Sequence, residues 1–153
     1  SSAYGVFQFG VLDSDDERIE ASMKLCMERL SVNTASGGHA RYVNDYYYRI
    51  DQQGTPGNPW FITTLWIAEY YIHKAYNRKM LQPAIDIFNW VASHQLETGV
   101  LSEQLHPHTA GPVSVAPLTW SHAGFVIAIN KYLEKLDNLG VCTMCNPPKY
   151  GDK

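Results

Sequence analysis

Apolar residues recur every three to four positions in several segments of the chain, the spacing that gives a helix one buried face. The first such segment reads SDDERIEASMKLCMERL, in which Ser14 and Glu17 have the spacing of a capping box at a helix start. The second, from about Trp60 to Ala75, is apolar on nearly every side. That pattern predicts a helix buried over most of its surface.

Two further segments follow the short turn YNRKM. An apolar stripe that begins at Leu81 predicts a third helix ending near Glu97 to Gly99, where glycine can terminate it. A fourth helix is expected to begin around Pro117 to Ser121 and to close at DNLG, and a short one is expected near Ala3 to Gly10. Because no segment alternates apolar and polar residues as strands do, the sequence predicts an all-α fold.

The connections between these helices differ greatly in length. The turn between the second and third helices is a few residues long, whereas the connections Ser31 to Pro59 and Thr98 to Ala116 are far longer. Consecutive helices packed in antiparallel order place both long connections at the same end. Loops beyond about 12 to 15 residues are usually functional or disordered, and the aromatic residues here argue against disorder. We therefore expect the functional site at this end.

Composition limits the class of protein. With 153 residues, 45% of them hydrophobic, the chain is long enough for one domain with a core. The net charge is -3 and the Lys and Arg residues are scattered, which is unlike a nucleic-acid-binding protein. The longest apolar run, Pro59 to Ile72, contains Glu69 and is shorter than the roughly 20 residues that span a membrane. We predict no nucleic-acid partner and no membrane segment.

Cysteines and histidines are the obvious candidates for metal ligands. The three cysteines are an odd number at low density, which favours a reducing compartment and predicts a cytoplasmic protein. Cys142 and Cys145 form one CxxC motif without a second ligand pair, and the HPH motif at His106 to His108 lacks a third ligand. We interpret the first as a turn in the tail and the second as ordinary loop residues, and we expect no metal and no cofactor.

Both long loops contain residues that suit a binding site. The first combines Arg41, Asp45, a run of tyrosines and Trp60. Charged forks bind sugar hydroxyl groups and aromatic faces stack on sugar rings, but a tyrosine-rich surface loop explains this composition equally well. The second loop holds Glu103 in the motif LSEQ and leads to Trp120. Taken alone, Glu103 is more simply read as a solvated loop carboxylate.

The motifs RYVND, GNPWFITTLWIAEYY, LSEQ and PLTWSHA occur in this order in glycoside hydrolase family 15. From about Tyr4 to Leu136 the chain resembles the bacterial and archaeal glucoamylase-like members of that family. The resemblance implies the C-terminal portion of an (α/α)₆ toroid, built of antiparallel helical hairpins with long active-site loops at one end. It makes residues 1–137 part of a catalytic domain and residues 138–153 a C-terminal tail.

The resemblance also implies an activity, the inverting hydrolysis of α-glucosidic bonds in glucose oligosaccharides or disaccharides. Glu103 takes the position of the general base, which activates the attacking water. Arg41 and Asp45 fall on substrate-pocket positions, and Trp60 and Trp120 on the aromatic wall. An inverting enzyme holds its base and acid carboxylates roughly 6.5 to 9.5 Å apart so that water fits between them. A loop without other carboxylates favours the ionised form that a base needs.

In the family the general acid lies upstream of the RYVND motif, and the acidic residues of this chain do not replace it. We therefore expect hydrolysis by the full-length protein and no activity from the chain alone. The alternative is a non-catalytic carbohydrate-binding or regulatory relative with the same helices. We also expect the isolated chain to form a homodimer, with Trp60, Trp66 and Tyr70 near the contact, unless the N-terminal segment covers that flank.

Overall fold

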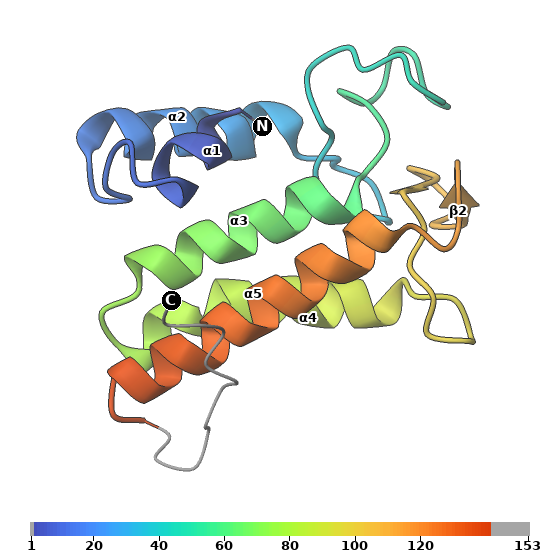
Figure 1. Ribbon diagram of the computed structural model, residues 1–153. Helices are drawn as coiled ribbons and strands as arrows, with labels where there is room; N and C mark the ends of the chain where they lie inside the picture. The colour runs from blue at the N-terminus through green and yellow to red at the C-terminus, as the bar shows by residue number, and fades with distance from the viewer. Residues whose placement is uncertain (1, 142–153) are drawn as a thin grey trace.

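The helices of this protein stack on both sides of a central helix, α3 (Phe61–Lys74), as Figure 1 shows. The structure, a computed structural model, describes residues 2–141. Along the chain the helices are α1 (Ala3–Gln8), α2 (Glu17–Leu30), α3, the 3-10 helix η1 (Arg78–Leu81), α4 (Gln82–Ser93) and α5 (Thr119–Asn138). From α2 to α5 each long helix runs antiparallel to the one before it (Figure 1). The predicted all-α fold of antiparallel hairpins is confirmed.

Helix α3 is apolar all round because it packs against other helices on both sides. One core cluster joins α3 to α4 and α5, and its buried members include Phe61, Leu65 and Ala128. A second cluster joins the opposite side of α3 to α1 and α2. The buried residues of this second cluster are Phe7, Ile19, Met23, Ile67 and Tyr70. Because α3 is buried on both sides, it provides a fixed anchor for the end of the loop that precedes it.

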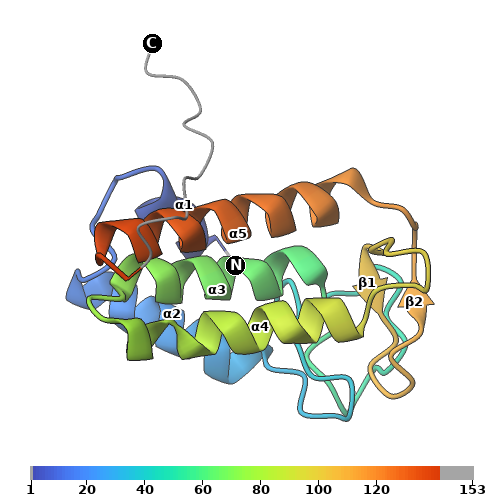
Figure 2. The ribbon, with the colours of Figure 1, turned by 90° about the horizontal axis from the view of Figure 1, so that it is seen from below.

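The two long connections meet at one end of the helices, as Figure 2 shows. In the second connection, β1 (Gln104–Leu105) pairs antiparallel with β2 (Pro112–Val113). Single antiparallel bridges then join Ser31 to His39, His39 to Trp60, and Trp60 to Gln104. The sequence did not predict these strands, because two-residue strands are too short to show an alternating pattern. The prediction that both loops share one end is confirmed.

Two helix ends differ from the prediction. Asp16, rather than Ser14, caps α2, because its side-chain Oδ1 accepts a hydrogen bond from the backbone N–H of Arg18 at 2.9 Å. Helix α4 ends at Ser93, before the predicted stop. The chain then turns through Gly99, whose φ of 79° lies in the left-handed region that glycine adopts without strain.

The predicted dimer contact is wrong for two of its three residues. Trp60 is 2% exposed and Tyr70 is 5% exposed, so neither side chain is free to bind another chain. The ring of Phe7 in α1 lies 5.7 Å from that of Tyr70, and Tyr4 stacks on Trp66 at 4.6 Å. The N-terminal segment therefore covers this flank of α3. This is the alternative to the dimer contact that was stated with the sequence prediction.

Because the flank of α3 is covered, the dimer predicted through that flank no longer has a basis, and the exposed apolar face of α5 leads to a separate prediction of a homodimer. Trp120, Val126 and Ile127 are each about half exposed on that helix, and apolar surface of this kind favours association. We expect sedimentation velocity at micromolar concentration to show a dimer, and Ile127→Lys to shift it to monomer. A monomer at all concentrations for the unaltered chain would refute the prediction. Among residues 2–141, no helix is long and apolar enough to cross a membrane.

Candidate active site

Arg41 and Asp45 form a bidentate ion pair in the first long loop, called here the fork of Arg41 and Asp45. Arg41 Nε donates to Asp45 Oδ2 and Arg41 Nη2 donates to Asp45 Oδ1, both at 2.9 Å. Asp45 is 1% exposed and also accepts the backbone N–H of Tyr47 at 3.1 Å. Partial burial alone lowers the pKa of Arg41, but the hydrogen bonds and charge of Asp45 outweigh it, so the pKa is raised above its usual value. The guanidinium is therefore fixed in place as a permanent cation.

Aromatic rings surround this cation. The Cζ atom of Arg41 lies 4.3 Å from the centroid of the Trp60 ring and 5.4 Å from that of Tyr47, distances at which a cation and a ring face attract. Trp60 is buried, whereas Tyr47 is nearly half exposed. The indole N–H of Trp60 is also buried, with no hydrogen-bond partner among the described residues. Arg41 thus contacts both Asp45 and Trp60, the two residues that the sequence assigned to the same pocket.

Glu103 lies in the second loop, immediately before β1. Its backbone N–H donates to Val115 O at 2.9 Å, and its carboxylate Oε2 lies 3.4 Å from Gln104 Nε2. Its side chain is partly exposed, while its neighbours Ser102 and Gln104 are buried. Since Gln104 bridges to Trp60, the carboxylate is one residue away from the backbone pairing that joins the two loops.

Two buried amides, which the sequence analysis did not single out, connect these loops. Asn58 Nδ2 donates to Gln104 Oε1 at 2.8 Å, across 46 positions of the chain. Asn58 is 2% exposed and Gln104 is 0% exposed. Asn58 belongs to the motif GNPW and Gln104 to the motif LSEQ, but in the sequence both look like ordinary polar loop residues. Only the contact between the loops reveals their pairing.

Trp120 lies apart from the Arg41 cluster. It is the second residue of α5, and its ring packs edge-on against Trp66 at 5.8 Å. The two tryptophans line a groove of about 460 Å³ together with Tyr4, Ile62 and Ile127. Ser121, the next residue, donates from its hydroxyl group to Ser102 O at 2.8 Å and so ties the start of α5 to the residue before Glu103.

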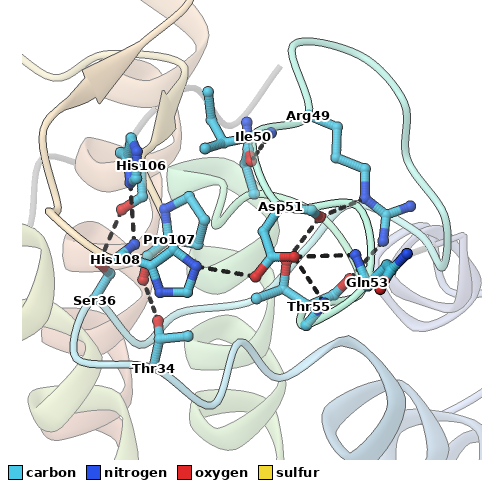
Figure 3. A network of polar contacts seen from close by, with 12 residues as sticks. Thr34, Ser36, Arg49, Ile50, Asp51, Gln53, Thr55, His106, Pro107 and His108 are labelled. Atoms are coloured by element: carbon cyan, nitrogen blue, oxygen red, sulfur yellow. Dashed lines mark hydrogen bonds and ion pairs between the residues drawn. The ribbon is translucent and has the colours of Figure 1, made fainter.

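A second set of polar contacts fastens the outer parts of the two loops together (Figure 3). His108 Nε2 lies 3.0 Å from Asp51 Oδ2. The backbone N–H groups of Gly54 and Gln53, followed by His108, lower the pKa of Asp51 below its usual value. On the other side of the same region, Ser36 Oγ donates to His106 O at 2.9 Å.

The histidines that raised the question of a metal therefore have other partners. His106 Nδ1 accepts the backbone N–H of His108 at 3.1 Å, and His108 faces Asp51. Within residues 2–141, no three His, Cys, Asp or Glu side chains gather closely enough to hold a metal ion. The CxxC motif of Cys142 and Cys145 lies outside the described residues.

These features define a class of protein. Antiparallel helical hairpins whose long loops converge at one end, one loop holding Glu103 and the other the ion pair of Arg41 and Asp45, have the architecture of part of an (α/α)₆ toroid. In a solved structure of a bacterial glucoamylase in complex with acarbose, a segment of that fold superposes on 86% of this chain with a TM-score of 0.68 and 24% identity. The fold prediction is confirmed.

Sequence comparisons agree with the fold. The model of the family described as glycosyl hydrolases family 15 matches residues 81–130. A Methanocaldococcus jannaschii protein described as an uncharacterized glycosyl hydrolase is 33% identical over 132 residues, which is 80% of this chain. These findings confirm the family resemblance, and the chain belongs to glycoside hydrolase family 15. It spans about a fifth of the length of both relatives.

Proposed function

We propose that this chain is the C-terminal part of an inverting glycoside hydrolase that cleaves α-glucosidic bonds in glucose oligosaccharides or disaccharides. The observation that carries the proposal is the bridge between Trp60 and Gln104. It sets the carboxylate-bearing loop directly beside the loop that holds Arg41, Asp45 and Trp60. A base and a rigid sugar-binding wall at one site are what hydrolysis of a glycoside requires of this part of the protein.

In the proposed reaction Glu103 is the general base. Its carboxylate takes a proton from water while the water oxygen bonds to the anomeric carbon and the bond to the leaving oxygen breaks. A general acid from another part of the full-length protein protonates the leaving oxygen. Arg41, which Asp45 holds in place, orients sugar hydroxyl groups, and the buried ring of Trp60 supports its guanidinium from behind. The half-exposed ring of Trp120 contacts a sugar face. A cytoplasmic location is also part of the proposal and rests on the low density of cysteine.

The stereochemistry of the product tests this proposal. We expect the full-length protein to release β-glucose from maltose or isomaltose, which proton NMR detects before the anomers equilibrate. Release of α-glucose would refute the inverting mechanism. Sugar binding without hydrolysis of maltose, isomaltose or trehalose would instead support the non-catalytic alternative. The isolated chain, measured in the same assay, is expected to be inactive.

A further inference from the structure

We propose that Asn58 and Gln104 are positioning residues that hold the carboxylate of Glu103 and couple it to the tyrosine segment, residues 46–48. This inference rests on the proposed function, because it concerns the same general base. Its basis is an unbroken series of hydrogen bonds that runs from the backbone of the first loop, through both buried amides, to Glu103.

The orientation of the Asn58 amide is set by the backbone around it. The N–H of Ile50 donates to Asn58 Oδ1 at 3.1 Å, and Asn58 Nδ2 donates to the carbonyl oxygen of Tyr48 at 2.8 Å. A backbone N–H only donates and a carbonyl oxygen only accepts. The opposite orientation of the amide would place donor against donor and acceptor against acceptor. The orientation of this side chain therefore follows from the chain itself.

Asn58 in turn fixes the amide of Gln104. Because Asn58 Nδ2 donates to Gln104 Oε1, the Nε2 of Gln104 must face the other way, toward Glu103 Oε2 at 3.4 Å. The backbone of Gln104 is also held, since its carbonyl oxygen accepts the hydroxyl of Ser102 at 2.7 Å. Both amides are almost completely buried, so water does not compete for these bonds and reversing either amide is costly.

This arrangement gives Glu103 a fixed N–H donor. Such a donor restricts the rotation of the carboxylate, and a general base needs a fixed orientation toward the water from which it takes a proton. The bond is long, as hydrogen bonds of catalytic groups often are before substrate binds. Of the described residues that form hydrogen bonds with Gln104, Glu103 is the one with a titratable side chain. The amide series also connects Glu103 with residues 46–48, which include Tyr47 beside Arg41.

Gln104→Glu in the full-length protein tests the series directly. The variant keeps the oxygen that Asn58 binds, but it replaces the donor facing Glu103 with a second carboxyl group. We expect kcat for maltose to fall about tenfold, because a hydrogen bond to a charged group is lost. The acidic limb of the kcat/KM profile should move about one pH unit upward, because a like charge opposes ionisation. KM should change little. Gln52→Glu, the same substitution at an exposed site of the first loop, should leave all three quantities unchanged.

Asn58→Asp tests the series from its far end and decides the matter if Gln104→Glu does not fold. It keeps the acceptor for Ile50 but removes the donor, so the amide of Gln104 reverses and turns its oxygen toward Glu103. We expect the acidic limb to shift in the same direction, although Asn58 does not contact Glu103. A lower melting temperature with a wild-type pH profile and kcat would overturn the inference. If Asn58→Asp has a wild-type pH profile while Glu103→Gln loses its activity, this inference is refuted and the proposed function stands. Full activity in Glu103→Gln refutes the proposed function itself.

Discussion

Replacing Glu103 with glutamine in the full-length protein is expected to lower kcat for maltose hydrolysis by about 10³-fold, within the range that general acid–base catalysis contributes. Glutamine has the same shape as glutamate, and its side-chain oxygen still accepts the N–H of Gln104 that now faces Oε2. It cannot take a proton from water. Ground-state binding of the sugar should therefore survive, and KM should stay within about threefold of its original value.

The matched control for this variant is Glu97→Gln. Glu97 is an exposed carboxylate between α4 and the second loop, so it offers the same change in charge close to the site without a proposed role. Its kcat and KM should match those of the unaltered protein. Steady-state rates on maltose, with melting temperatures for both variants, provide the comparison. Near-native turnover by Glu103→Gln would make Glu103 a structural loop residue.

Periodicity located the helices because each buries a continuous face. Helix α3 was predicted within one residue at either end, since nearly all of its side chains are buried. Helix ends were less predictable, because neighbouring polar side chains compete for the same backbone N–H groups. Asp16 and Ser14 are both good caps, and only the path of the chain before α2 decides between them. The packing of α1 against Tyr70 was equally hard to predict, because it depends on the path of the chain between α1 and α2.

Residues of the candidate site that lie close together in the sequence could be grouped from the sequence alone. Arg41 and Asp45 are four positions apart in one loop, and the structure brings them into direct contact. The link between Asn58 and Gln104 was not predictable, because it joins two loops whose separation in space depends on the packing of α3, α4 and α5. Trp120 illustrates the same limit. The sequence placed it on the wall with Trp60, whereas its ring contacts Trp66.

The ion pair of Arg41 and Asp45 gives the second large effect, because the buried carboxylate of Asp45 accepts three N–H groups, two from Arg41 and one from the backbone of Tyr47. Asparagine at position 45 offers one acceptor oxygen and turns an NH₂ group toward the other donor of Arg41. Breaking a buried ion pair costs about 3 to 5 kcal/mol. The Arg41 side chain is 29% exposed, so we discount this to about 2 kcal/mol for the free energy of unfolding of Asp45→Asn.

The same substitution should impair sugar binding more than turnover. Without the fork, Arg41 is no longer held 4.3 Å above Trp60, and the wall that orients the sugar loses its fixed cation. We expect KM for maltose to rise about thirtyfold in the full-length protein, the equivalent of about 2 kcal/mol, with kcat reduced much less. Urea unfolding and steady-state kinetics measure the two effects, with Asp86→Asn on the exposed side of α4 as the control.

Arg41→Lys separates charge from geometry, because an ammonium keeps the charge but cannot form the fork. If Arg41→Lys binds maltose normally, charge alone suffices and the fork has no part in orienting the sugar.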